Sequence, residues 1–311
     1  MLKKILRNFS SLFGFLLLAL SLWAISNELR EYNYRDVFNS LTAIPLSRLG
    51  LGVGLTSLGY LAMTGYDTLA FRYIHRSLAY RKIAFTNFIS CAASNTIGFA
   101  LLTGSAIRYR FYSAWGVAPL AIAQVIAFVN FSFWLGLLTV AGILFLLHPL
   151  ATPTQLHLPF VSVRPIGLIF LILVVTYLLG STISRRPLRV RAQELQFPSL
   201  EISLSQILVS SLDWSLAAAV LYTLLPTSTH LSYSGFLEIY LLAMTAGVLS
   251  NVPGGLGVFE TVVLLLLSPQ VPAAAVLGSL LAYRGVYYFL PLALATALLG
   301  LYEVYQRLKV R

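Results

Sequence analysis

Long, unbroken apolar runs separated by short polar stretches dominate this chain. Runs such as LLTVAGILFLL and IGLIFLILVVTYLLG lack the alternation of apolar and polar residues found in β-barrel strands, so they predict membrane-embedded helices. No connecting stretch is long enough for a soluble domain. We therefore expect an all-α polytopic membrane protein, with a single transmembrane domain over residues 1–311. Eight apolar segments can be drawn, at about 10–26, 47–71, 84–107, 117–147, 165–184, 203–225, 236–267 and 272–303.

The third and seventh segments differ from plain spans. The third has polar and small residues at its centre, including Asn95 and Gly98, and the seventh carries SNVPGGLG at residues 250–257. Proline and consecutive glycines interrupt a helix, and a break at membrane depth must be buried in protein or line a cavity. Each of these two segments therefore predicts a re-entrant helical hairpin, which enters and leaves the membrane on one side.

The distribution of basic residues tests this topology. With the N-terminus in the cytoplasm, eight spans place 11 basic residues inside and 9 outside. Six spans plus two re-entrant hairpins place 16 inside and 4 outside, with Arg284 left within a span. The positive-inside rule therefore favours six spans, two hairpins and cytoplasmic termini. The N-terminal stretch resembles a signal peptide but lacks a convincing small-x-small cleavage site, which favours a retained first span.

The two broken segments also share a motif that indicates an internal repeat. Ser94-Asn95-x-x-Gly98 and Ser250-Asn251-x-x-Gly254 lie 156 residues apart, and the same shift aligns the first four segments with the last four. The predicted repeats cover approximately residues 1–155 and 156–311. Each would contain three spans and one hairpin, an odd number of crossings, so the halves would be inverted. Such inverted repeats are typical of transporters with a site near the membrane midplane.

Composition and charge exclude several function classes. Hydrophobic residues make up 58% of the chain and charged residues only 10%, against about 25% charged in a soluble domain. The net charge of +11 fits the positive-inside bias and anionic lipid, so no nucleic-acid partner is expected. A lone cysteine, Cys91, and four isolated histidines predict no metal site. Motifs for a nucleophile elbow, a P-loop or a dinucleotide site are absent, so we expect neither an enzyme nor a cofactor.

Ionisable side chains inside membrane segments are energetically unfavourable, so each one present is a functional candidate. Asp67 and Glu260 are candidates for a proton or counter-ion site. The structural alternatives are that Asp67 is solvated near the interface and that Arg284 is satisfied by a carboxylate. The candidates are Asp67, Arg108, Arg110, Asp213, Glu260 and Arg284.

The helix breaks themselves predict anion binding. After VPGG a half-helix begins, and its free N–H groups and positive dipole end attract a phosphate or carboxylate. Asn251, Gly254 and Gly255 are therefore candidate substrate ligands. Asn95, before the third-segment break, is expected to cap the matching half-helix from the opposite side.

The charged candidates predict how a lipid headgroup would be recognised. Arg108 and Arg110 would form charge-assisted hydrogen bonds to a phosphodiester, as would Arg284. Glu260 and Asp213 would face any cationic part of the headgroup. Because Glu260 is near the first turn of its half-helix, stabilisation by the helix dipole is its simpler explanation.

Five blocks of the sequence resemble a known family. They are SNVPGGLGVFE (250–260), LDWSLAAAVLYTLLP (212–226), TGYDTLAFRY (64–73), NTIGFALLTGSAIRYRFY (95–112) and YRGVYYFLPLALA (283–295). Together they resemble the N-terminal membrane domain of bacterial lysylphosphatidylglycerol synthase/flippase, and the resemblance covers essentially the whole chain. In full-length members this domain moves aminoacyl-phosphatidylglycerol, made by a cytoplasmic synthase domain, to the outer leaflet. The synthase domain is not in this sequence, so the resemblance implies the lipid-translocating half.

We therefore expect a non-enzymatic lipid transporter of the bacterial inner membrane, with anionic or aminoacylated phospholipid as its partner. Two alternatives remain open. One is a non-transporting partner of a separately encoded lipid synthase or glycosyltransferase. The other is a small-solute or ion transporter that uses the same hairpins. The sequence also leaves open a homo-oligomer.

Overall fold

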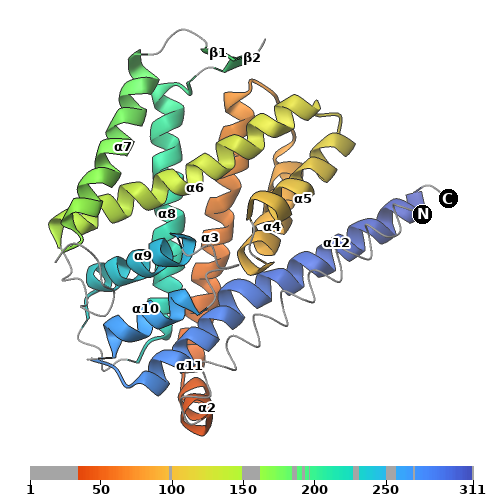
Figure 1. Ribbon diagram of the computed structural model, residues 1–311. Helices are drawn as coiled ribbons and strands as arrows, with labels where there is room; N and C mark the ends of the chain where they lie inside the picture. Colours follow the sequence, from red (N-terminus) through yellow and green to blue (C-terminus); the bar gives the residue numbers. More distant parts are fainter. Residues whose placement is uncertain are drawn as a thin grey trace.

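In the computed structural model, the regular secondary structure of the described residues is helical apart from one short β-ribbon (Figure 1). The structure describes residues 34–97, 100–148, 162–183, 188–190, 193–195, 197–226, 231–249, 257–268 and 270–309. In chain order the elements are α2 (Tyr34–Thr42), α3 (Leu46–Tyr73), α4 (Tyr80–Ile97), α5 (Ala100–Ala114), α6 (Pro119–Leu147), α7 (Arg164–Ile183), β1 (Leu188–Val190), β2 (Gln193–Leu195), α8 (Leu200–Leu224), α9 (Tyr233–Leu249), α10 (Val258–Leu267), α11 (Ala273–Tyr283), the π-helix η3 (Arg284–Phe289) and α12 (Leu290–Lys309).

The long helices coincide with predicted spans. Among the described residues, four helices are long and apolar enough to cross a membrane: α6, α7, α8 and the continuous run Ala273–Gln306. Helices α2 and α3 meet this criterion as a pair, bent by 79° at the break between them. The predicted first span, 10–26, lies outside the described residues. The prediction of a helical, polytopic membrane protein is confirmed.

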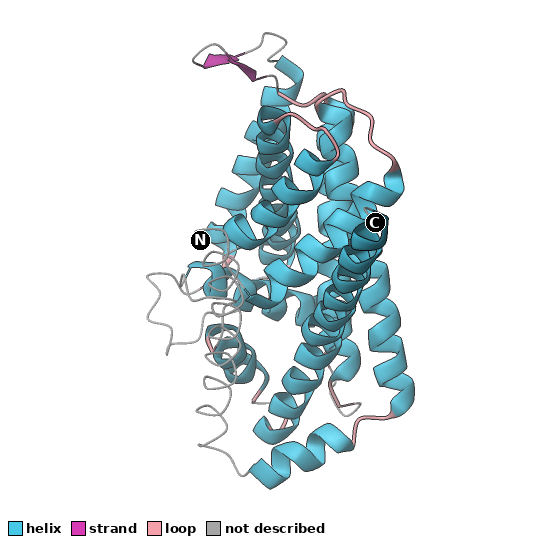
Figure 2. Cartoon of the chain, turned by 90° about the vertical axis from the view of Figure 1, so that its right-hand side faces the viewer, coloured by secondary structure: helices cyan, strands magenta, loops and turns pink. Residues whose placement is uncertain are grey.

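The all-α prediction missed the ribbon between α7 and α8. Strands β1 and β2 are antiparallel, with Leu188 opposite Leu195 and Val190 opposite Gln193. Three-residue strands are too short to produce a recognisable hydrophobic period, so the sequence pattern did not reveal them. Figure 2 shows the ribbon at one end of the helical body.

The outer face of α7 is apolar. Only Gly167 and Val174 are buried along this helix. More than half of the surface of each of seven large aliphatic side chains is exposed: Leu168, Ile169, Ile172, Leu173, Val175, Leu179 and Ile183. An apolar face of this extent is unfavourable in water and favourable against lipid. It supports the assignment of α7 as a lipid-facing span.

Helices α3, α6 and α8 form the centre of the fold. In Figure 1, α3 and α8 lie side by side, and α6 crosses them obliquely. The Trp214 indole N–H of α8 donates to the Phe133 carbonyl of α6 at 3.0 Å. Three residues after Phe133, slightly less than one turn, the absence of a side chain at Gly136 lets α6 approach Ser210 of α8. A Cβ at this position would lie 2.5 Å from the Ser210 Cβ and 2.7 Å from its carbonyl oxygen.

We expect Gly136→Ala to lower stability by about 1–3 kcal/mol, because the added methyl must push the backbones of α6 and α8 apart. The measurement is the apparent melting temperature of the detergent-solubilised protein. Gly300→Ala in α12 is the matched control, since a Cβ there meets nothing within 4 Å. It should leave stability unchanged or raise it slightly, because alanine favours the helix. Equal melting temperatures for both variants would contradict the close crossing.

Each broken segment forms two packed short helices. Along α4 and α5, Phe85 contacts Phe111 with ring centroids 5.3 Å apart, and Ser94 lies against Gly104. The later residue on α4, Ser94, contacts the earlier residue on α5, Gly104. The two helices are therefore antiparallel. In the second pair, Tyr240 of α9 contacts Phe259 of α10 at 5.5 Å. The break 250–256 itself lies outside the described residues.

Candidate functional site

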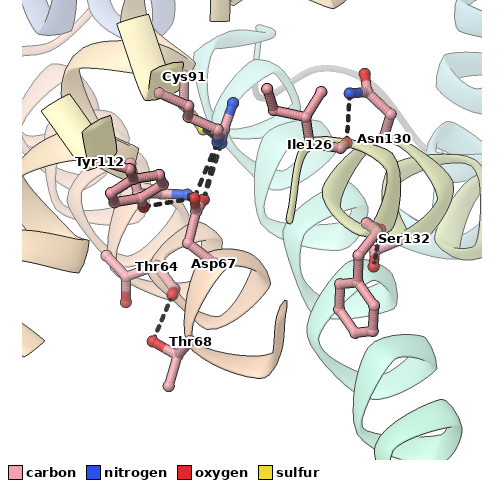
Figure 3. Close-up of polar contacts among 11 residues, drawn as sticks. Thr64, Asp67, Thr68, Cys91, Tyr112, Ile126, Asn130 and Ser132 are labelled. Atoms are coloured by element: carbon pink, nitrogen blue, oxygen red, sulfur yellow. Dashed lines mark hydrogen bonds and ion pairs between the residues drawn. The ribbon is translucent and has the colours of Figure 1, made fainter. Parts of the chain in front are cut away.

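Asp67 of α3 and Arg108 of α5 form a buried ion pair. Arg108 donates from Nε to Oδ1 of Asp67 and from Nη2 to Oδ2, each at 2.9 Å. Asn87 Nδ2 of α4 donates to Oδ2 at 2.6 Å, and the Tyr112 hydroxyl donates to Oδ1 at 2.7 Å. Figure 3 shows bonds converging on the Asp67 carboxylate, with Cys91 beside it. Both carboxylate oxygens have charged or polar donors, and these bonds tie the α4/α5 pair to α3.

Glu260 of α10 and Arg284 of η3 form a second buried ion pair. Arg284 donates to Oε1 of Glu260 from Nε at 2.7 Å, and also from Nη2. The other oxygen, Oε2, accepts the backbone N–H of Gly257 at 2.9 Å. The carboxylate therefore also caps the first turn of α10, where negative charge complements the helix dipole. The guanidinium lies 5.6 Å from the centroid of the Tyr288 ring.

The π-helix η3 connects Arg284 to the first hairpin. Pro291 has no N–H, so the Tyr287 carbonyl lacks its α-helical donor, and the Leu290 N–H reaches back five residues to Gly285. The Tyr60 hydroxyl of α3 donates to the Tyr287 carbonyl at 3.4 Å. The next carbonyl along η3, that of Tyr288, accepts a bond from Thr96 Oγ1 of α4 at 3.2 Å. Carbonyls in the widened turn thus bind both α3 and α4.

Asp213 of α8 is a third buried carboxylate, with only 4% of its surface exposed. The Tyr66 hydroxyl donates to its Oδ2 at 2.8 Å. Its Oδ1 is buried and has no hydrogen-bond partner among the described residues. Because Tyr66 and Asp67 are adjacent on α3, this helix contacts two carboxylate sites through neighbouring residues.

Three hydroxyls of the first hairpin lack partners among the described residues, and that of Ser94 lies next to Arg108. Ser90 and Ser94 of α4 and Ser105 of α5 each have a buried Oγ without a hydrogen-bond partner in the described part of the chain. Gly104 lets Ser94 and Arg108 converge, because a Cβ there would be too close to Ser94 Oγ and 3.0 Å from Arg108 Nη1. Arg108 uses Nε and Nη2 on Asp67, which leaves Nη1 without a hydrogen bond to any described residue. The Ser94 hydroxyl and the Arg108 guanidinium therefore meet beside Gly104, and the backbone of Ser90 lies at the same place.

Two predictions about the site need correction, and one is confirmed. Asp67 is fully buried, so the alternative that it is solvated near the interface is wrong. Asn95 lies inside α4, two residues before its end, so it is not the N-cap of α5. The alternative that Arg284 is satisfied by a carboxylate is confirmed by its bonds to Glu260.

The remaining candidates lie apart from these clusters or outside the described residues. Arg110 is exposed and forms a surface ion pair with Glu303 of α12, although it is only two positions from Arg108. Asn251, Gly254 and Gly255 lie outside the described residues.

Sequence reasoning missed the polar partners of the charged groups. Tyr112 follows Arg108 by four residues on α5, a spacing that places both on one helix face and that predicts a shared partner. Asn87 is a polar residue in a largely apolar stretch of α4, which is also a recognisable signal. Tyr66 had no such signal, because its bond to Asp213 joins residues 147 positions apart.

With this geometry in place, the comparison with known families is decisive. Residues 11–295 match the family model described as "Lysylphosphatidylglycerol synthase TM region". The chain belongs to this family. The matched range includes every buried ionisable residue of the two ion pairs, as well as Asp213.

Among individual relatives of this lysylphosphatidylglycerol synthase TM region family, some match over most of their own length and one only over about a third. "Uncharacterized protein slr0712" of Synechocystis sp. is 49% identical over 96% of this chain and 92% of its own length. "Inner membrane protein YbhN" of Escherichia coli is 33% identical over 86% of this chain and 83% of its own. "Phosphatidylglycerol lysyltransferase" of Staphylococcus aureus is 28% identical over 91% of this chain, which spans 32% of that protein. The likeness to the long relative is therefore confined to about a third of its length.

Proposed function

We propose that this protein is an inner-membrane lipid transporter that moves phospholipid between leaflets without enzymatic activity. Its relative YbhN is named as an inner membrane protein, and the long staphylococcal relative is named for a reaction on phosphatidylglycerol. Both names support a bacterial inner-membrane protein that handles an anionic lipid. Aminoacyl-phosphatidylglycerol is a second cargo that the proposal includes.

The observation that carries the proposal is the group of polar donors in the first hairpin. Ser90 and Ser94 offer buried hydroxyls, and Arg108 offers Nη1. Buried polar groups without partners are unfavourable unless a ligand satisfies them. A phosphodiester presents oxygens that accept bonds from hydroxyl and guanidinium groups alike. The acyl chains would remain in the surrounding lipid while the headgroup phosphate binds here.

The hairpin geometry supports re-entrant entry. Helices α4 and α5 contain 18 and 15 residues, and α9 and α10 contain 17 and 10, whereas a span needs about 20. Each half of the described chain also ends with two short packed helices followed by a long helical run. This order supports the inverted-repeat arrangement, in which the two hairpins enter from opposite sides and face a common headgroup path.

Headgroup-labelled lipid translocation in proteoliposomes tests the function. The lipids compared are phosphatidylglycerol, a lysyl-phosphatidylglycerol analogue and a zwitterionic lipid. We expect Ser90→Ala/Ser94→Ala to slow phosphatidylglycerol movement about tenfold or more, because each hydrogen bond to a charged group contributes about 1.5–3 kcal/mol. Ser113→Ala is the matched control, since Ser113 is exposed on α5 and its hydroxyl donates to the local Arg110 carbonyl.

The result separates this proposal from the two alternatives. Wild-type rates in the double variant would contradict phosphate binding at the two serines. Folded wild-type protein that moves no lipid would contradict transport and favour a partner of a separately encoded lipid-modifying enzyme. Thermal stabilisation by a small solute, without any lipid effect, would favour a solute transporter.

A further inference from the structure

The three buried carboxylates of the site differ in their counter-ions. Asp67 accepts two bonds from Arg108, and Glu260 accepts two from Arg284. Asp213 accepts one bond, from the neutral Tyr66 hydroxyl, and no lysine or arginine among the described residues forms an ion pair with it. Its second oxygen is buried without any partner in the described part of the chain. An ionised carboxylate in this setting is strongly disfavoured, whereas a protonated carboxyl is not.

The groups that face Asp213 are phenols and a thiol. Five residues from four neighbouring elements lie within electrostatic reach of it: Tyr60 and Tyr66 of α3, Cys91 of α4, Tyr240 of α9 and Tyr287 of η3. None of these side chains carries a positive charge.

The other titratable groups on the helices around α8 are bonded to other residues or lie away from Asp213 along their helix. Asp67 is held by Arg108, and Tyr283 of α11 bonds to Tyr240. Tyr177 of α7 bonds to Gln206, which is about two turns from Asp213 on α8. Helix α6 contains no titratable residue. Helix α9 carries two more, Tyr233, whose hydroxyl donates to the Ser215 carbonyl, and the buried Glu238. The described residues around Asp213 therefore offer it no compensating cation.

We propose that Asp213 is the proton-binding site of this transporter, and that lipid movement depends on its protonation state. The second part of this inference rests on the proposed function. In the neutral form the Asp213 carboxyl holds the proton and accepts a hydrogen bond from the Tyr66 hydroxyl. Ionisation releases one proton and creates a negative charge that nothing in the described surroundings compensates.

The position of Asp213 explains how such a change would reach the headgroup site. Cys91, one of the groups within electrostatic reach of Asp213, has its Sγ 3.8 Å from Arg108 Nη2. Tyr66, which binds Asp213, is adjacent in sequence to Asp67, which binds Arg108. A change in the charge of Asp213 is therefore expected to alter the electrostatic environment of Arg108, the arginine proposed to bind phosphate. The roles of Asp67 and Glu260 as proton sites are weakened, since each is already neutralised by an arginine.

Infrared difference spectroscopy of the full chain in proteoliposomes directly detects whether the Asp213 carboxyl is protonated. At neutral pH the wild type should show the carbonyl stretch of a protonated carboxyl, and Asp213→Asn should abolish this band. Glu201→Gln is the control, because Glu201 is exposed in the first turn of the same helix, and the band should persist in it. If Asp213→Asn does not fold, Tyr66→Phe provides a second variant. It removes the donor to the carboxyl and should shift the band without abolishing it.

Translocation of labelled phosphatidylglycerol as a function of pH tests the coupling. The wild-type rate should change about tenfold per pH unit where the active form is in the minority, while Asp213→Asn should vary less than about twofold. A band that survives Asp213→Asn, or is absent from the wild type, would overturn the proton site. Equal pH dependence in wild type and variant would overturn the coupling. A band without lipid movement would uphold the proton site and contradict the proposed function instead.

Discussion

Arg108→Ala is expected to destabilise the protein by about 3–5 kcal/mol, because it leaves the carboxylate of Asp67 buried without a counter-ion. Asp67 is fully buried, and only Asn87 and Tyr112 would remain as donors to it. The same change removes the Arg108 bonds between α5 and α3 and leaves the Tyr112 hydroxyl as the α5 donor to Asp67, so the first hairpin is held less firmly. The measurement is the free energy of unfolding of the protein in lipid bicelles.

Two comparisons distinguish this pair from ordinary surface charge. Arg110→Ala should cost at most about 1 kcal/mol, because its ion pair with Glu303 is solvent-exposed. Asp67→Asn/Arg108→Met should recover most of the stability lost in Arg108→Ala, since removing both charges leaves no uncompensated group. If the double variant were as unstable as the single variant, the penalty would come from lost packing rather than from the unpaired carboxylate.

The helices were predictable because their signals are local. The long apolar runs predict α6, α7 and α8 to within a few residues, since an apolar stretch of this length has few alternatives to a membrane helix. The Pro-Gly-Gly break predicted that one helix ends before residue 250 and another begins after it, as α9 and α10 do. The bend between α2 and α3 was not predicted, although the sequence places Pro45 at that point.

The site was predictable only in part, because its pairings join distant residues. The rule that charged residues in membrane segments are candidates identified Asp67, Arg108, Glu260 and Arg284, but not which partner each would take. The sequence suggested arginines free to bind phosphate, whereas each is already bonded to a carboxylate. Only the folded chain identifies Asp213 as the carboxylate of the three without a cation among the described residues.

The two ion pairs have related positions and opposite polarity. In each hairpin the second helix supplies one charged residue, an arginine in α5 and a glutamate in α10. The partner comes from the long helix before the first hairpin and from the long helical run after the second. Each hairpin is therefore fastened to a spanning element of its own half. A hairpin held in this way resists rigid displacement unless its ion pair opens.

Glu260→Gln is expected to cost about 3–5 kcal/mol, because it leaves the Arg284 guanidinium buried without a negative partner. The glutamine carbonyl still accepts the Gly257 N–H that Glu260 Oε2 accepts now, so the cap of α10 survives. Glu260→Ala removes this cap as well and should cost about 0.5–2 kcal/mol more. Unfolding in bicelles should therefore rank wild type above Glu260→Gln and Glu260→Gln above Glu260→Ala. Glu303→Gln, at the exposed partner of Arg110, should match the wild type, and equal stability of Glu260→Gln and Glu303→Gln would show that the buried pair contributes little to the fold.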